Sequence, residues 1–301
     1  MEGLVKLSFY CFAASSIAIG FSALAYVVFG VGRVRLHRTV LTTSAGTTIS
    51  GTSAQMLPGS TSAGRFGTML AWLGVFFAGS AVLLRTVASH RGPYSNMYEF
   101  SLAFVFAGAL IYLLFERMYG VKQLGAIVVP IVFGMTLYIW YLPTNMREIA
   151  GLNPSLQNQP LMTAHVSMAI LSYATFAISF AAACLYLITS RRRVSWLPSA
   201  EMLDDIGYRA VTFGFPMLAL VLILGSIWAY RAWGTYWSWD PKETSALFTW
   251  LVYGVYLHTR SLRGWRGRRS AYILLFGFGA VVFTYYGNYF FGGMHAYGGV
   301  K

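Results

Sequence analysis

Apolar runs of membrane-spanning length recur along almost the whole chain. A helix needs roughly 20 mainly apolar residues to cross a bilayer, and the runs reach that length, unlike the alternating segments of a membrane barrel. Charged residues make up only 10% of the 301 residues and hydrophobic residues 57%, a balance that no soluble domain of this size carries. The sequence therefore predicts an all-α fold, a polytopic membrane helix bundle.

About eight transmembrane helices are predicted in this bundle. The first helix lies within residues 1–30. Residues 31–65 are predicted to form a flexible cytoplasmic linker, because 39–64 carry no charge and are mostly small or polar. Residues 66–301 form the transmembrane core, and its segment 199–209 has its apolar residues on one helical face, which predicts a short interfacial helix. The predicted spans are 5–29, 66–89, 98–117, 123–142, 163–189, 210–230, 243–260 and 271–291.

Basic residues are divided unevenly between the two sets of loops. Fifteen of the 22 Lys and Arg residues fall in the loops that follow the first, third, fifth and seventh spans. Cytoplasmic loops carry an excess of Lys and Arg, so these loops are predicted to be cytoplasmic and both termini extracytoplasmic. The net charge of +13 is then explained by the basic residues of the cytoplasmic loops. No nucleic-acid-binding module is recognised, and no nucleic-acid partner is expected.

The segment WGTYWSWDPKE at 233–243 carries a second strong signal. Asp240 is a candidate N-cap, Pro241 suits the first helical position, and Glu243 stands where a capping box requires it. A helix is therefore predicted to begin here, after an extracytoplasmic loop at 231–243 that we call the Trp-rich loop. An ordinary interfacial aromatic belt is the alternative interpretation. The loop concentrates four aromatic rings, those of Trp233, Tyr236, Trp237 and Trp239.

Counting membrane crossings brings four motifs to one side. Residues 95–100 precede the third span, His165 opens the fifth, the Trp-rich loop joins the sixth to the seventh, and His295 follows the eighth. Each neighbouring pair is separated by two crossings, so all four face the same side. The distribution of charge makes that side extracytoplasmic.

The Trp-rich loop resembles the WWD signature of haem-handling membrane proteins. The chain as a whole resembles the CcsA/ResC family of cytochrome c biogenesis proteins of System II. The resemblance covers the chain from about position 85 to its end, in the family's own order. The further motifs that carry it are SNMYEF at 95–100, LMTAHVSM at 161–168, GFPML at 214–218, YLHTR at 256–260 and MHAYG at 294–298.

The resemblance implies that the chain transports haem and presents it for covalent attachment to apocytochrome c on the extracytoplasmic face. It implies haem b as a non-covalently held cofactor, a CcsB/ResB-like membrane subunit and a C-x-x-C-H apocytochrome c as partners, and a location in a plasma or thylakoid-type membrane. The chain would be a component of a cytochrome c haem-lyase complex without a conventional acid–base site. The alternatives are haem delivery to a chaperone and a membrane electron-transfer subunit with permanently bound haem.

Histidine is a common axial ligand of haem iron. The resemblance assigns His165 and His295 to an outer haem, beside Trp233, Tyr236, Trp237, Trp239 and Asp240 of the Trp-rich loop. Taken singly, either histidine is more simply an interfacial polar residue. Both are predicted as metal ligands because the crossing count brings them to one face.

His258 lies apart from this group. It follows Pro241 by 17 residues, roughly 25 Å along a helix, and an ionisable residue in a span is a functional candidate. The resemblance makes it one ligand of an inner haem, whose opposite ligand comes from the partner subunit. A simpler alternative is an interaction with the helix C-terminus beside Arg260.

Haem propionates need cations or amide donors. Arg85, Arg231 and Lys242 are the candidates on the outer side, although basic residues at a membrane edge commonly meet lipid headgroups. The role of His90 stays open. Cys11 and Cys184 lie inside apolar runs and predict neither a disulfide nor a metal site.

Overall fold

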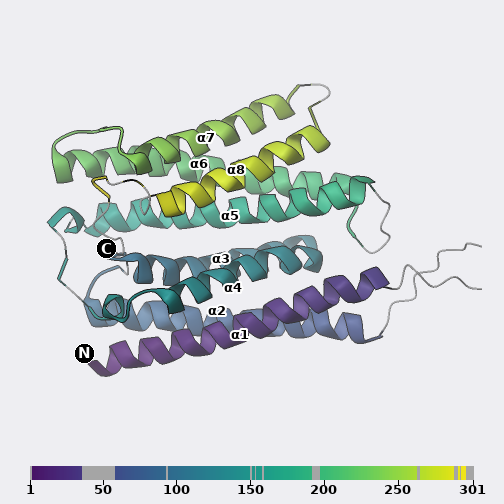
Figure 1. The fold of residues 1–301 in the computed structure, drawn as a ribbon, viewed down its shortest axis with the longest axis horizontal. Helices are drawn as coiled ribbons and strands as arrows, with labels where there is room; N and C mark the ends of the chain where they lie inside the picture. The colour runs from purple at the N-terminus through teal and green to yellow at the C-terminus, as the bar shows by residue number, and fades with distance from the viewer. Residues whose placement is uncertain are drawn as a thin grey trace, which may run out of the picture.

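Long helices run side by side, as the ribbon of the computed structural model shows (Figure 1). The structure describes residues 2–35, 58–92, 94–149, 151–152, 154–157, 159–191, 197–262, 265–287, 291 and 293–295. These residues contain no strand, which confirms the predicted all-α class. The helices are α1 (Glu2–Arg35), α2 (Pro58–Ser89), α3 (Met97–Tyr119), α4 (Gly125–Tyr141), α5 (Gln159–Arg191), α6 (Ala200–Trp233), α7 (Pro241–Arg260) and α8 (Arg268–Tyr286). The short 3-10 helices among the described residues are η2 (Lys122–Leu124), η3 (Thr144–Arg147) and η4 (Pro154–Leu156).

Seven of the eight helices in the described part of the chain are long and apolar enough to cross a membrane. The exception is α7, which carries Lys242 and Glu243 in its first turn and His258 and Arg260 in its last. Large apolar side chains such as Phe21, Phe76 and Ile223 are more than half exposed on the outside of the bundle. Such a surface is stable only against lipid, and the chain is therefore an integral membrane protein.

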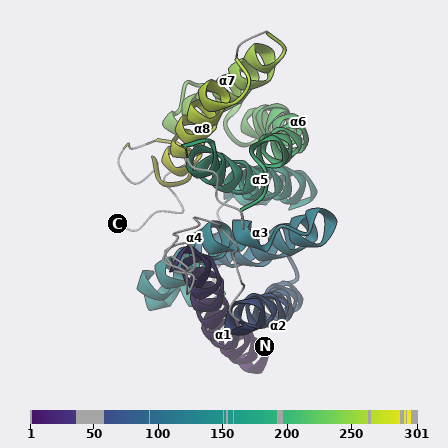
Figure 2. The ribbon, with the colours of Figure 1, turned by 90° about the vertical axis from the view of Figure 1, so that its right-hand side faces the viewer.

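The helices form two groups that meet at α3 and α5. α1 packs along α2 and also against α4, while α5 packs along α6 and also against α8. α3 contacts α2, α4 and α5, and α7 lies on α6 and α8 (Figures 1 and 2). Small residues let helices approach closely in membranes, and α5 has a row of buried alanines toward its neighbours. These alanines are Ala169, Ala174, Ala177, Ala181, Ala182 and Ala183.

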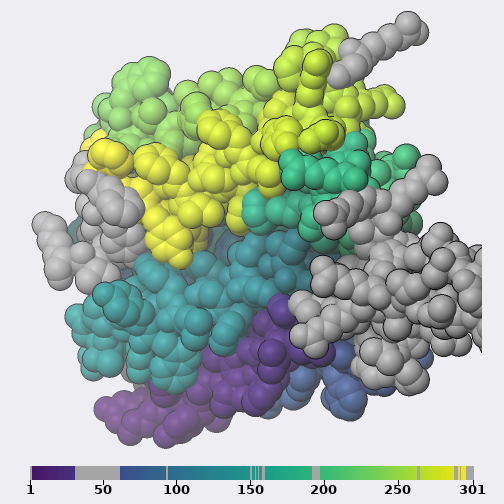
Figure 3. Space-filling model, turned by 45° about the vertical axis from the view of Figure 1, so that its right-hand side comes forward, coloured from purple at the N-terminus to yellow at the C-terminus, as the bar shows by residue number. Residues whose placement is uncertain are grey.

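One face of the molecule shows where the two groups touch near the end of α8. In Figure 3, α8 (yellow) lies directly beside the segment of α4 (teal). The rings of Tyr138 and Tyr286 meet edge to face with centroids 5.3 Å apart, and the Tyr286 hydroxyl lies 3.5 Å from the Met135 sulfur. The Tyr285 hydroxyl also bonds Ser101 of α3 at 2.6 Å. These contacts fix the end of α8, which belongs to the second group, against α3 and α4 of the first.

The observed helices correct two predicted segments. Both ends of the predicted linker 31–65 are helical, since residues 31–35 belong to α1 and residues 58–65 to α2, while residues 36–57 lie outside the described residues. The segment 199–209 is the first part of α6 and not a separate interfacial helix. Its apolar face is buried in the bundle through Leu203 and Ile206, and its Asp204 pairs with Arg260 of α7 at 2.7 Å.

Candidate functional site

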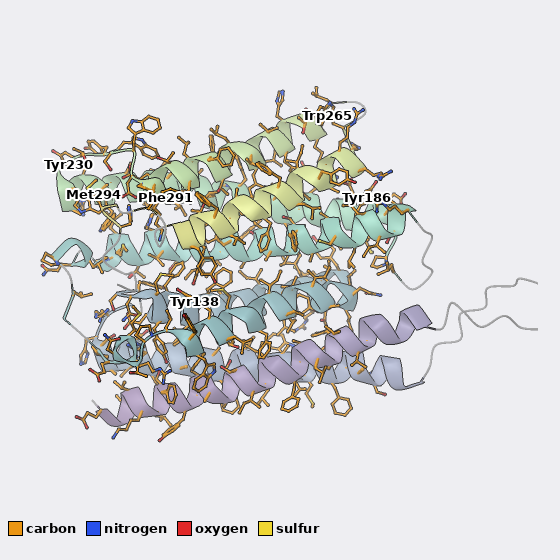
Figure 4. All side chains as sticks on the ribbon, in the orientation of Figure 1. Tyr138, Tyr186, Tyr230, Trp265, Phe291 and Met294 are labelled. Atoms are coloured by element: carbon orange, nitrogen blue, oxygen red, sulfur yellow. The ribbon has the colours of Figure 1, made fainter. Side chains whose placement is uncertain are left out.

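The motifs placed on one side by the crossing count lie at one end of the bundle, which we call the cavity end. In Figure 4, Tyr230 and Met294 mark this end, and Tyr186 and Trp265 mark the opposite one. A cavity of about 140 Å³ is lined there by residues from α3, α5, α6, α7 and α8 and by His295. The crossing count is therefore confirmed for all four motifs. The lining of the cavity includes Ser95, Asn96, Phe100, His165, Val221, Trp228, Tyr236, Trp237, Lys242, Glu243, Tyr285 and His295.

The Trp-rich loop is held by its two ends. Gly234 ends α6 in the left-handed conformation with φ +80°, which glycine adopts without steric cost. At the other end the Glu243 carboxylate accepts hydrogen bonds from the backbone amides of Ser238 and Asp240, at 2.9 and 3.3 Å. These bonds help to hold Trp239, between the two amides, at φ +59°, which is uncommon outside glycine.

Asp240 connects the start of α7 to the segment after α8. Its Oδ1 atom accepts hydrogen bonds from the Lys242 amide and from His295 Nδ1, both at 2.9 Å. Its Oδ2 atom accepts one from the Met294 amide at 2.7 Å. Gly293 passes so close that a Cβ there would collide with Oδ2. One buried carboxylate thus caps a helix and positions an imidazole.

The environment of Asp240 keeps it ionised. Burial alone would raise the pKa of the Asp240 carboxyl. The hydrogen bond and charge of His295, together with the Lys242 and Met294 amides, outweigh burial and lower this pKa to about 2. His295 therefore faces a carboxylate at neutral pH, the arrangement that orients many metal-ligating histidines.

His165 is positioned by α6. Its Nδ1 atom lies 3.0 Å from the Val221 carbonyl oxygen, so a neutral imidazole donates its proton there and turns Nε2 into an acceptor. Gly225 makes room for the ring, because a Cβ at that position would lie 2.8 Å from His165 Cε1. The α5–α6 contact therefore sets both the position and the tautomer of His165.

Trp228 lies against both imidazoles. Its ring stacks on His165 with a centroid distance of 6.4 Å and an interplanar angle of 15°, and lies 5.5 Å from His295. Trp233 meets His295 edge to face at 5.0 Å and Trp228 at 4.7 Å. The distance between the two imidazole centroids therefore cannot exceed the sum of their distances from the Trp228 centroid. Two imidazoles and an aromatic wall are thus assembled at one cavity.

The predicted site residues separate into three groups. His165, His295, Tyr236 and Trp237 line the cavity. Trp233 and Asp240 support His295 from behind, and Trp239 points outward with 70% of its surface exposed. His258 is exposed in the last turn of α7, at the opposite end of the helix. Their roles in binding haem stay predictions.

Three residues that complete the site were not predicted: Trp228, Val221 and Gly225. All three lie on α6, before the Trp-rich loop, within an apolar run. Trp228 had one available signal, since it lies five residues before Trp233 in the same aromatic-rich helix end. The other two act through a backbone carbonyl and a missing side chain, for which a single sequence offers no signal.

Two further residues considered in the sequence, Arg85 and His90, do not line the cavity. Arg85 is 1% exposed. Its guanidinium forms an ion pair with Glu99 at 2.9 Å and donates hydrogen bonds to the carbonyl oxygens of Arg147 and Glu148 at 2.7 and 3.1 Å. It thus ties α2 to α3 and to the loop after α4. His90 is an exposed residue with φ +54° at the end of α2 and does not line the cavity.

Comparison with known proteins adds the family. Residues 94–295 match the family described as Cytochrome C assembly protein. The cytochrome c biogenesis protein CcsA of Guillardia theta is 40% identical over 242 residues, which cover 71% of this chain and 79% of that protein. The CcsA of Synechococcus elongatus is 35% identical over 258 residues, covering 68% of this chain and 79% of that one.

A solved structure shares the fold. The cytochrome c heme lyase CcmF superposes with a TM-score of 0.60 at 18% identity, over 92% of this chain but only 46% of that one. This likeness concerns the arrangement of helices alone. The family match over residues 94–295, by contrast, spans the residues that line the cavity, and the two CcsA proteins are 40% and 35% identical to this chain. The chain therefore belongs to the cytochrome c assembly protein family.

Proposed function

We propose that this protein holds haem at the cavity end, on the extracytoplasmic side, and presents it for covalent attachment to apocytochrome c. The family supports a role in cytochrome c biogenesis, and the heme lyase among the structural neighbours supports haem as the cargo. The single observation that carries the proposal is the pair His165 and His295. They come from helix α5 and from the segment after α8, yet lie against the same tryptophan at one cavity.

The residues present fit a haem in three ways. Both imidazoles have Nδ1 bonded to a protein oxygen, which is how proteins orient histidine toward iron through Nε2. The lining between them is mainly aromatic and apolar. The cavity also reaches the surface at Tyr236, which is 56% exposed. The cavity is partly open to the surface, so a second protein can reach a macrocycle bound there, as transfer requires.

The attachment reaction needs little acid–base help from the protein. Each cysteine thiol of the C-x-x-C-H segment adds across one haem vinyl group. A C–S bond and a C–H bond form while the S–H bond and the vinyl π bond are lost, so atoms and electrons balance. The chain contributes by binding and orienting the cargo beside its acceptor. The exposed rings of Tyr236 and Trp239 offer the acceptor an apolar surface next to the cavity.

The first test uses full-length protein purified with its membrane partner. We expect the absorption bands of a bis-imidazole haem in the wild type and their loss in His165→Ala and His295→Ala, together with loss of cytochrome c maturation in cells. His90→Ala is the matched control, because His90 is an exposed histidine near the same end that does not line the cavity. Full maturation and unchanged bands in both cavity variants would remove this site from the account.

The inner site is a second part of the proposal. His258 is exposed at the far end of α7. There a CcsB/ResB-like subunit can supply the second axial ligand of an inner haem, whose first ligand is His258. We expect His258→Ala to reduce the haem recovered with the complex while haem added from outside still binds His165 and His295. Equal haem recovery from the variant and the wild type would argue against an inner site at His258.

A further inference from the structure

One cation of the cavity forms no ion pair with any described carboxylate. Lys242 lines the cavity in the first turn of α7 and is only partly exposed. Within the part of the chain that the structure describes, its ammonium group forms no ion pair or hydrogen bond. An ammonium held in an apolar, partly buried site without a partner is costly, which makes such a residue a candidate for binding a ligand.

The neighbouring carboxylates are already occupied. Asp240 accepts three hydrogen bonds, from the Lys242 and Met294 amides and from His295. Glu243 also lines the cavity, but its Oε2 atom accepts hydrogen bonds from the Ser238 amide and hydroxyl and from the Asp240 amide. Neither carboxylate bonds the Lys242 ammonium, which leaves that charge to a ligand.

The other two predicted cation candidates are placed where they cannot serve the cavity. Arg85 is buried and engaged by Glu99 and by backbone carbonyls. Arg231 is exposed near the end of α6 and is not part of the lining. Among the described lining residues, Lys242 is the one Lys or Arg.

We propose that Lys242 anchors a carboxylate of the cavity's ligand, which for a haem is a propionate. The inference rests on the proposed function and adds an orientation to it. An aromatic lining and two imidazoles hold the plane of a macrocycle without choosing which of its edges enters. A single cation at the start of α7 makes that choice, because only an edge that carries a carboxylate pairs with it. The opposite edge of haem, which carries no carboxylate, then faces away from Lys242.

The test compares two probes, haem and haem dimethyl ester, in which both propionates are esterified. The full-length protein, freed of haem, is titrated with each probe while the absorption spectrum is recorded. We expect Lys242→Gln to weaken haem binding about tenfold or more, the range of a charge-assisted hydrogen bond. Its affinity for the ester stays within about twofold of the wild type. Lys242→Arg retains most of the affinity for haem.

Arg231→Gln is the matched control, because it removes one positive charge close to the same end without touching the cavity. Its ratio of haem affinity to ester affinity equals that of the wild type. A wild type that binds the ester as tightly as haem overturns the proposal without any variant. A Lys242→Gln protein that weakens both probes equally, or neither, overturns it as well.

The outcomes separate this inference from the function beneath it. If neither probe gives a bis-imidazole spectrum with the wild type, the haem site itself is wrong. If both give that spectrum and the affinity ratio does not depend on Lys242, the haem site stands and the carboxylate anchor is wrong.

Discussion

The two groups of helices treat their buried charges differently. In α1–α4, Glu99 is met by Arg85 at 2.9 Å, by Arg91 at 3.3 Å, and by the amide and hydroxyl of Ser95 at 2.8 and 2.7 Å. In α5–α8, Asp240 lies behind a cavity, and Lys242 faces that cavity with no ion pair or hydrogen bond of its ammonium group to the residues that the structure describes. The ionic groups of the first arrangement are paired within the protein, whereas the Lys242 ammonium of the second is available to a ligand.

A second closed cluster lies near the other end of α3. The Glu116 carboxylate accepts hydrogen bonds from Tyr26 and Tyr112, both at 2.5 Å, and from Thr68 at 2.6 Å, with Lys122 at 3.6 Å. These partners join α1, α2 and η2 to α3. Closed clusters of this kind fix how helices pack, while the open one is available to a ligand. The contrast predicts that variants in α1–α4 lose stability and variants at the cavity lose binding.

The largest effect on stability is expected for Arg85→Met. This variant leaves the Glu99 carboxylate buried without its 2.9 Å ion-pair partner. Breaking a buried ion pair by removing one partner costs about 3–5 kcal/mol. We expect a large drop in the thermal unfolding midpoint, measured by tryptophan fluorescence in detergent, and poor recovery of folded protein. The exposed Arg231→Gln serves as control and leaves the midpoint unchanged. An Arg85→Met protein of normal stability that fails to bind haem would reverse the assignment of the two regions.

Asp240→Asn comes next and separates capping from positioning. Asparagine is as good an N-cap as aspartate, but it carries no negative charge to face His295, and its NH2 group replaces the oxygen that accepts from the Met294 amide. We expect a small change in unfolding midpoint and a haem affinity lower by about 10- to 100-fold, the usual range for losing the partner of a ligating histidine. Asp240→Ala, which also removes the cap, provides the comparison. Haem affinity that is unchanged in Asp240→Asn, with stability lost only in Asp240→Ala, would mean that Asp240 acts only as a cap.

The sequence predicted the local parts of this site well. Asp240, Pro241 and Glu243 form a start signal that depends on neighbours in the chain, and the observed helix begins at Pro241 with the full capping box. The crossing count brought His165 and His295 to one end, because it needs only the number of spans.

The parts that the sequence did not predict depend on how helices pack. Val221, Gly225 and Trp228 meet His165 only because α6 lies along α5 in one rotation and one register. An apolar run that faces lipid on one side and protein on the other carries little periodic signal for that rotation. For the same reason the first turns of α6 were predicted as a separate interfacial helix, whereas Leu203 and Ile206 are buried.

Gly225→Ala tests this packing with one carbon atom. The added Cβ would lie 2.8 Å from His165 Cε1, so the imidazole has to move. We expect haem affinity to fall by about tenfold, because a displaced ligand costs binding in the way a lost supporting bond does. Gly134→Ala on α4 is the matched control, since a Cβ there meets nothing within 4 Å. If both variants bind haem equally, the α5–α6 contact does not position His165.

The smallest effect is expected for Glu116→Gln. The amide keeps the shape of the side chain but turns one acceptor into a donor, opposite the hydroxyls of Tyr26 and Tyr112. Hydroxyl groups rotate and can accept instead, so we expect a loss of only about 1 kcal/mol in stability, with haem affinity unchanged. Asp205→Asn, which disrupts an exposed pair with Arg209, is the control and shifts the midpoint less. A clear loss of haem from Glu116→Gln would show that the closed clusters reach the cavity through α3, and the division between the two regions would then not hold.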